Sequence, residues 1–234
     1  MQFGEDERPG VSAAVARARR RDAAESAERA RLERLYSLER ALRREGFELV
    51  AGVDEVGRGA LAGPLSAGAC VLPARPRIPG LNDSKQLAPP RRAEIAARVR
   101  EVAIACAVYH VEADELDRLG MTAALKLAMR GALSALEVEI DHVVVDGNPL
   151  HLTEAETAVV GGDGKVAAIA AASVIAKVER DSLMVAASDS HPAYGFEINK
   201  GYGTAEHMQA IREVGVCVLH RRSFVPCSGM DRLF

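Results

Sequence analysis

The stretch "AGVDEVGRGALAGPL", residues 51–65, places two adjacent carboxylates, Asp54 and Glu55, just ahead of a Gly-Arg-Gly triplet at the end of an apolar run. The flanking segments, "FELVAGVD" (47–54) and "LSAGACVL" (65–72), have the composition of β-strands. Only a short, glycine-containing connection separates them, which predicts an antiparallel hairpin. The two acids therefore lie where a strand ends, which is where open α/β sheets commonly place their chemistry.

The rest of the chain alternates strand and helix. Further strands are expected at 104–113 and 141–148, and helices at 89–104, 113–137 (one long helix), 167–188 and 204–215. The helix at 167–188 is lined with small residues, so we expect it to lie close against a sheet. This order predicts an α/β fold in which a mixed β-sheet is flanked by helices, followed by a C-terminal helical region.

Residues 1–46 differ in composition from residues 47–234, and we predict an N-terminal extension followed by one catalytic domain. The extension is rich in Arg, Ala and Glu, which favours helix. Its apolar stripe comprises Leu32, Leu35, Tyr36 and Leu42. The first dozen residues have little that could pack, and we expect disorder there. The helical part either docks on the core or reaches toward a substrate; glutamates between its arginines favour a solvated face over a nucleic-acid patch.

The composition is that of a soluble globular protein, with 234 residues, 48% of them hydrophobic, and a formal net charge of -3. No apolar stretch approaches the roughly 20 residues that span a bilayer, and no signal-peptide pattern is present. We therefore expect a cytoplasmic protein. The four cysteines form no C-x-x-C pair, which favours reduced thiols over a zinc site or disulfides.

Two more acids lie at an expected strand end or tight loop: Asp146 in "VVVDGN" and Asp163 in "GGDGK". Each alone is explained as a turn-forming aspartate. Together with Asp54 and Glu55 they would repel one another unless a cation lay between them, and a set without Cys or His favours Mg²⁺ or Mn²⁺ over zinc. A site with several acids and two such ions suits phosphodiester cleavage. Neighbours on a strand point to opposite faces, but the glycine turn relaxes this rule for Asp54 and Glu55.

Several motifs together resemble those of bacterial ribonuclease HII, the type 2 ribonuclease H family. They are "AGVDEVGRGALAGPLSAGA", "LNDSKQL", "VVVDGN", "GDGKVAAIAAASVIAKVERD", "NKGYGTAEH" and "LHRRSF", in the family's order over roughly residues 48 to 226. The resemblance implies a ribonuclease H-like fold, with the N-terminal extension outside it. It also implies hydrolysis of the RNA strand of RNA/DNA hybrids and cutting on the 5′ side of single ribonucleotides in duplex DNA, leaving 3′-hydroxyl and 5′-phosphate ends.

The resemblance also assigns roles to residues. It implies that the metal-binding acids are Asp54, Glu55, Asp146 and Asp163. It also implies that Gly57, Arg58 and Gly59 recognise the 2′-hydroxyl of the substrate, and that Tyr202 packs on a sugar. Backbone groups of a glycine turn can bond a 2′-hydroxyl without regard to the base, which agrees with this assignment. Without its glycine neighbours, Tyr202 would be interpreted as an ordinary core tyrosine.

Other polar residues leave alternatives open. Lys85 is either a phosphate contact or a solvated lysine. Ser173, Lys177 and Arg180 are spaced to present a polar stripe to the nucleic-acid backbone. We expect Asp181 to be structural, paired with a nearby base. The "HRR" residues His220, Arg221 and Arg222 either bind phosphate or cap the C-terminal fold.

The chain departs from the family pattern at two positions. Gly161 stands where a lysine is usual before the fourth acid, and Gly120 stands where many relatives have asparagine. Neither change removes an expected ligand, so we expect them to bear on rate or metal preference rather than on activity itself.

Two other functions compete with this interpretation. A type 3 ribonuclease H shares the fold, but lacks the Gly-Arg-Gly motif and has a larger N-terminal domain. A nucleic-acid-binding protein without turnover would gain nothing from repelling carboxylates near phosphates. The expected partners are RNA/DNA hybrids and DNA duplexes that contain ribonucleotides; no motif indicates a protein partner or a membrane.

Overall fold

A five-stranded mixed sheet forms the centre of the protein, in the order β3-β2-β1-β4-β5. The computed structural model describes residues 9–229. The strands are β1 (Val50–Val56), β2 (Leu65–Val71), β3 (Ala105–Val111), β4 (His142–Asp146) and β5 (Glu156–Val159). Strands β1 and β2 are antiparallel, whereas β1 and β4 are parallel. The expected hairpin and mixed sheet are therefore confirmed; the four-residue, half-buried β5 was not predicted, because it is too short to show a period.

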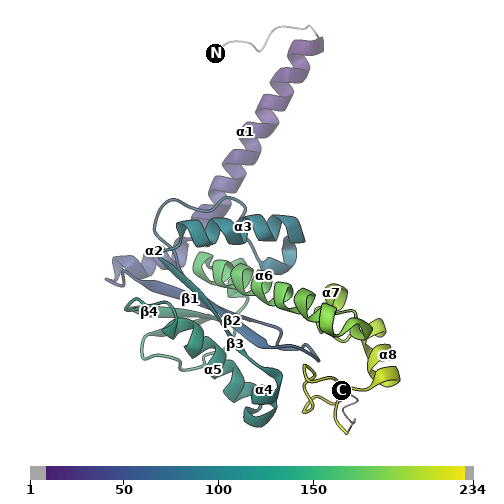
Figure 1. Cartoon of the computed structure of the whole chain (residues 1–234). Helices are drawn as coiled ribbons and strands as arrows, with labels where there is room; N and C mark the ends of the chain where they lie inside the picture. Colours follow the sequence, from purple (N-terminus) through teal and green to yellow (C-terminus); the bar gives the residue numbers. More distant parts are fainter. Residues whose placement is uncertain (1–8, 230–234) are drawn as a thin grey trace.

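Helices cover both faces of this sheet (Figure 1). They are α1 (Pro9–Leu35), α2 (Ser37–Arg44), α3 (Pro89–Val102), α4 (Ala113–Leu119), α5 (Met121–Ser134), α6 (Ala167–Ser190), α7 (Phe196–Asn199) and α8 (Ala205–Val214), with 3-10 turns η1 (Ser84–Gln86), η2 (Gly162–Gly164) and η3 (Pro192–Tyr194). One apolar core lies between the sheet and α5, and a second lies between the sheet, α3 and α6. The chain thus has three layers, as the expected fold class requires.

One expected helix is in fact two. We predicted a continuous helix over 113–137, but α4 ends at Leu119 and α5 begins at Met121. Gly120 between them has φ +76, a left-handed conformation that glycine adopts without the steric cost of a Cβ. This gives a physical reason for Gly120, where many relatives have asparagine.

Helix α6 lies against β1 and β2 at a distance that only glycines permit. A Cβ on Gly52 would lie 2.1 Å from the carbonyl carbon of Ala168, and one on Gly68 would lie 2.3 Å from the carbonyl oxygen of Ala172. Both obstacles are backbone atoms of α6, which cannot turn aside as a side chain can. The expected close packing of the small-residue helix on the sheet is confirmed.

This packing predicts the effect of Gly52→Ala. The added methyl group forces α6 away from the sheet, and we expect the free energy of unfolding to fall by about 3 kcal/mol, as in overpacked cores. Urea denaturation measures the change. Gly164→Ala is the control, because a Cβ there meets nothing within 4 Å; equal stability of the two variants would contradict the close packing.

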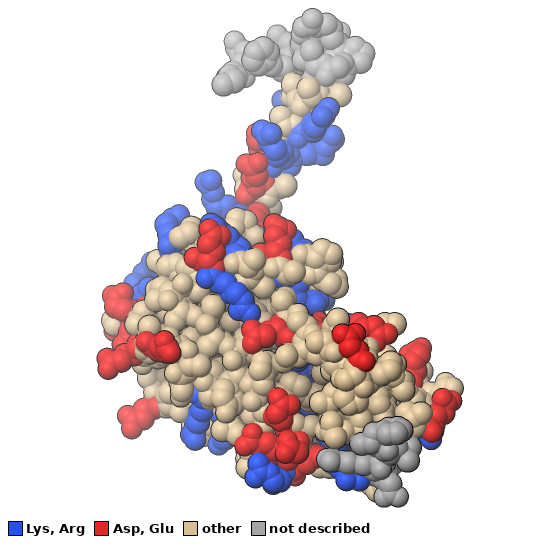
Figure 2. Space-filling view, viewed as in Figure 1, with Lys and Arg blue, Asp and Glu red and all other residues tan. Residues whose placement is uncertain are grey.

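The N-terminal extension is anchored at one end and projects at the other (Figure 1). Its predicted stripe is buried: Leu32, Leu35, Tyr36 and Leu42. The preceding turns of α1 carry exposed arginines and acids side by side, as expected of a solvated face (Figure 2). The expectation of disorder in the first dozen residues falls on 1–8, which lie outside the described residues, and on 9–12, which begin α1. The division at residues 46 and 47 stays a prediction.

The extension also holds the loop that leads to η1. Glu28 accepts a hydrogen bond from Gly80 N at 2.8 Å, and Arg31 donates to Leu81 O at 2.9 Å. Glu39, buried, accepts from Ala168 N at 2.8 Å, at the start of α6. The helical part of the extension therefore docks on the core, which was one of its two expected behaviours.

Two expectations from composition can be compared with the described residues. Across 9–229, none of the helices combines the length and apolar character needed to span a bilayer. In the described part of the chain, no disulfide joins the four cysteines; Cys70, Cys217 and Cys227 are buried and Cys106 is half-buried.

Candidate active site

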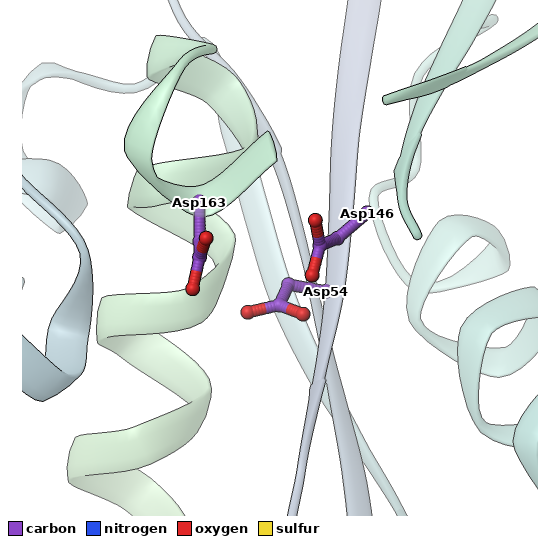
Figure 3. A group of neighbouring side chains, drawn as sticks. All are labelled: Asp54, Asp146 and Asp163. Carbon is purple, nitrogen blue, oxygen red and sulfur yellow. The ribbon is translucent and has the colours of Figure 1, made fainter. Parts of the chain in front are cut away.

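Three aspartates from distant parts of the chain converge at one edge of the sheet (Figure 3). Asp54 lies on β1, Asp146 ends β4, and Asp163 lies in η2 just before α6. One carboxylate oxygen from each lies within 4.8 Å of those from the other two. Asp54 is 4% exposed and Asp163 8% exposed. The structure thus brings together three of the four acids that the sequence analysis singled out.

Local folding explains this convergence. Strands β1 and β4 are parallel with Val53 opposite Val145, so the residues that follow, Asp54 and Asp146, lie side by side. Asp146 Oδ1 then accepts a hydrogen bond from Gly162 N at 2.6 Å, which ties the turn carrying Asp163 to β4.

The turn that carries Asp163 also explains why Gly161 stands where a lysine is usual in the family. Gly161 has φ +65, in the left-handed region that favours glycine over lysine. The ammonium of Lys165 lies beside it and donates to Val160 O at 2.6 Å. The chain therefore keeps a positive charge in this turn, although that charge comes from a different position.

Burial makes ionisation of the clustered carboxyl groups unfavourable when no cation is bound. The pKa of Asp54 is raised to about 8, chiefly because burial penalises the carboxylate and further because Glu55 and Asp146 are nearby. A cation among the three carboxylates would reverse this effect. Carboxylate oxygens with no Cys or His among them match a hard divalent ion such as Mg²⁺ or Mn²⁺. Asp54, Asp146 and Asp163 are the residues that would hold such an ion.

Glu55 is placed differently from the three aspartates. It is not a member of the group within 4.8 Å, and its Oε1 lies 3.5 Å from Arg58 Nη1. Burial raises the pKa of Glu55, Arg58 lowers it, and the charge of Asp146 raises it, which places this carboxylate close to the cluster. Its role as a fourth ligand stays a prediction.

Lys85 and Ser173 contact the aspartates directly. Lys85 Nζ lies 3.2 Å from Asp163 Oδ2, although the lysine side chain is 77% exposed, so Lys85 is both solvated and paired with an acid of the cluster. Its contact with a phosphate stays a prediction. The hydroxyl of Ser173 lies 2.9 Å from Ser84 Oγ, and it opposes the rise in the pKa of the neighbouring Asp54 carboxyl. Because Ser173 is 4% exposed, it supports Asp54 from the interior of the protein.

A hollow of about 380 Å³ lies beside the acids. It is lined by Glu55, Val56, Gly57, Arg58, Gly59, Ser84, Lys85, Ser173, Lys177 and Tyr202. Tyr202 is half-buried in its wall, with Lys177 Nζ 5.4 Å and Arg180 Cζ 5.3 Å from the ring centroid. Lys177 also pairs with Asp181 at 2.8 Å, as expected for a structural acid. The Gly-Arg-Gly turn, Tyr202 and two lysines thus share one concave surface.

Arg180 does not take part in the expected polar stripe. It is fully buried, and it donates hydrogen bonds to the carbonyl oxygens of Pro64, Lys200 and Ala62 at 2.9, 2.9 and 3.0 Å. This part of α6 packs against the loop after the Gly-Arg-Gly turn and not against solvent. The expectation that Arg180 faces nucleic acid is therefore wrong.

Within the "HRR" segment, the structure settles the open alternative for Arg221. It is fully buried and donates to Gly63 O at 2.9 Å and to Arg58 O at 3.1 Å. His220 is buried as well, and Arg222 N donates to Asp117 at 2.7 Å. Arg221 thus caps the fold, one of its two expected roles, and joins the C-terminal region to the Gly-Arg-Gly turn.

Comparison with known proteins shows the family of the chain. The family model described as ribonuclease HII matches residues 51–227. A ribonuclease HII of Moorella thermoacetica is 50% identical over 202 residues, covering 86% of this chain and 98% of that protein. The chain belongs to the ribonuclease HII family. A second ribonuclease HII, of Listeria monocytogenes, is 44% identical over 222 residues, covering 95% of this chain and 85% of that protein.

Membership in the ribonuclease HII family makes the protein a ribonuclease H, a nuclease that acts on RNA/DNA substrates and depends on divalent metal. The family model described as the ribonuclease HII N-terminal domain matches residues 1–43. The expectation that the extension lies outside the family resemblance is therefore wrong.

Solved structures match the fold of this ribonuclease HII. The ribonuclease H2 of Pyrococcus horikoshii matches with a TM-score of 0.65 and 26% identity, over 76% of this chain and 94% of that one. A Bst-RNase HIII in complex with Mn²⁺ matches with a TM-score of 0.64 and 21% identity, over 76% of this chain and 68% of that one. The expected ribonuclease H-like fold is confirmed.

Proposed function

We propose that this protein is an endonuclease that hydrolyses the RNA strand of RNA/DNA hybrids and cuts 5′ of single ribonucleotides in duplex DNA, leaving 3′-hydroxyl and 5′-phosphate ends. The observation that carries the proposal is that three aspartates, two of them buried, adjoin a hollow lined by the Gly-Arg-Gly turn and Tyr202. Family membership supports the nuclease class. Ribonucleotides in genomic DNA occur in the bacterial cytoplasm, and we propose that location for the enzyme.

Asp54, Asp146 and Asp163, with Glu55 as the proposed fourth ligand, are the residues that would hold two divalent ions. Bound Mg²⁺ or Mn²⁺ would activate a water and stabilise the leaving oxygen of a phosphodiester. Lys85, beside Asp163, and Lys177, in the wall of the hollow, place positive charge where a phosphate backbone would enter.

Recognition of the ribonucleotide is assigned to the Gly-Arg-Gly turn and to Tyr202. The turn is closed by a hydrogen bond from Ala60 N to Gly57 O at 3.2 Å, and Arg58 and Gly59 are exposed on it. An exposed backbone without a Cβ can approach a sugar closely and bond its 2′-hydroxyl. The ring of Tyr202 then favours a following sugar without a 2′-oxygen, on steric grounds.

A cleavage assay tests this proposal. The substrates are a labelled DNA duplex with one ribonucleotide, an RNA/DNA hybrid and an all-DNA duplex, each with Mg²⁺, Mn²⁺ or EDTA. We expect one metal-dependent cut 5′ of the single ribonucleotide, cleavage of the hybrid, and no cleavage of the all-DNA duplex. Cutting of the hybrid alone would contradict the junction specificity, and no cleavage with either metal would contradict the nuclease assignment.

A further inference from the structure

Two buried histidines form a hydrogen-bonded pair that reaches the main chain of Tyr202. His207, in α8, is 0% exposed and His220 is 2% exposed. The Nε2 atoms of the two rings lie 3.1 Å apart. At the other ends of the pair, His207 Nδ1 lies 2.9 Å from Tyr202 O, and Cys217 N donates to His220 Nδ1 at 3.0 Å. The two rings thus connect the C-terminal segment to the backbone of Tyr202.

The partners of this pair allow one arrangement of protons. Tyr202 O can only accept, so His207 Nδ1 carries a proton; Cys217 N–H can only donate, so His220 Nδ1 carries none. With both rings neutral, His220 Nε2–H donates to His207 Nε2. A proton added to His207 Nε2 would place two N–H donors against each other, so the pair disfavours protonation. Burial acts in the same direction, because it lowers the pKa of His207 and lowers that of His220 to about 4. The pair is a directional chain of hydrogen bonds that ends on Tyr202.

The main chain of Tyr202 is consequently held by several partners. Its carbonyl oxygen accepts from Thr204 N at 2.8 Å as well as from His207, and its N–H donates to Asn199 O at 2.9 Å. Of these contacts, the one from His207 is made by a side chain, from α8, whereas the other two are made by main-chain atoms of Asn199 and Thr204. Together with the hydrogen bonds from Leu61 N and Ala62 N to Gly201 O, it holds the short Gly201–Gly203 segment in place.

We propose that His207 and His220 are positioning residues for Tyr202, and that they set the preference of the enzyme for a ribonucleotide followed by DNA over continuous RNA. The inference rests on the proposed function, in which Tyr202 packs on the following sugar. Discrimination by packing depends on the distance between ring and sugar, because a 2′-hydroxyl adds a single oxygen atom. A loosened Tyr202 would accommodate that oxygen and reduce the preference.

The test compares two variants of one residue. His207→Leu removes the donor to Tyr202 O, whereas His207→Asn places an amide N–H at the position of Nδ1 and restores it. The readout is the ratio of kcat/KM on a duplex with one ribonucleotide to kcat/KM on an RNA/DNA hybrid. We expect His207→Leu to lower this ratio about tenfold and His207→Asn to keep it within about twofold of wild type.

Two further variants separate positioning from folding. In a Tyr202→Ala background, His207→Leu is expected to leave the ratio unchanged, because the ring through which it acts is absent. If His207→Leu does not fold by circular dichroism, His220→Leu, which removes the donor to His207 Nε2, is expected to lower the ratio about threefold. A folded leucine variant with an unchanged ratio overturns this inference alone. Absence of cleavage of the single-ribonucleotide duplex by wild type overturns the proposed function, and this inference with it.

Discussion

Asp54→Asn is expected to lower the cleavage rate at least about 10⁴-fold while leaving the protein folded. The residue belongs to the three-aspartate group and is buried, and an amide offers a divalent ion one neutral oxygen in place of a carboxylate. Single-turnover cleavage of a ribonucleotide-containing duplex measures the effect. Asp114→Asn, at an exposed position on α4, is the matched control and should retain full activity.

The same substitution is expected to stabilise the metal-free protein at high pH. The pKa of Asp54 is about 8 in the folded state against an ordinary value of 3.8. Between these values the unfolded chain releases a proton that the folded protein retains, so wild type loses stability as pH rises from about 4 to 8. Asparagine has no proton to release. In EDTA, the variant should therefore be more stable than wild type by a few kcal/mol at pH 8.5, since one pKa unit corresponds to about 1.4 kcal/mol, and the gain should vanish near pH 4.

Urea denaturation in EDTA at several pH values measures this difference. Mg²⁺ should then raise the stability of wild type and have little effect on Asp54→Asn, because binding to the folded state stabilises it. A gain in stability that does not change with pH would show that Asp54 is ionised in the metal-free protein. An equal response of both proteins to Mg²⁺ would place the ion elsewhere.

Local sequence was sufficient to predict the framework of the site. A short glycine-containing connection predicts the hairpin that ends at Asp54, and three valines before Asp146 predict a buried strand with an acid at its exit. Strand β4 then pairs with β1 in parallel, which brings these two acids together. The hairpin and the strand depend on residues close in sequence and therefore leave a pattern in the chain, whereas the pairing of β4 with β1 was not predicted.

The features that sequence did not reveal depend on packing between distant segments. Arg180 has the spacing of a polar stripe on α6, yet it is buried because the 57–64 loop and the Lys200 carbonyl surround it. Glu39 is indistinguishable from the solvated glutamates around it, although it is 1% exposed and accepts from the start of α6. A hydrogen bond to a main-chain carbonyl or amide leaves no complementary residue in the sequence, so no pattern marks these contacts.

Of the two glycines of the Gly-Arg-Gly turn, only Gly57 is expected to lose stability when it is replaced by alanine. A Cβ on Gly57 would lie 2.1 Å from Arg180 Nε, and Gly57 has φ +83. Arg180 cannot move aside cheaply, because three carbonyl oxygens hold its guanidinium. We expect Gly57→Ala to lower the free energy of unfolding by about 4 kcal/mol, from backbone strain and overpacking together. Cleavage of a single-ribonucleotide duplex should fall at least about 10²-fold, since the turn and Tyr202 are displaced with Arg180.

Gly59→Ala is the matched variant, because a Cβ there meets nothing within 4 Å and the residue is exposed. Its free energy of unfolding should stay within about 0.5 kcal/mol of wild type, as at ordinary surface positions. If the turn approaches the sugar as proposed, the new methyl group obstructs the substrate and KM for the single-ribonucleotide duplex rises, with folding unaffected. Wild-type KM in Gly59→Ala would mean that the substrate does not reach this backbone, and the 2′-hydroxyl would then have to be recognised elsewhere in the hollow. The pair thus separates what Gly57 does for the fold from what Gly59 does for the ligand, which a substitution of Arg58 between them could not do.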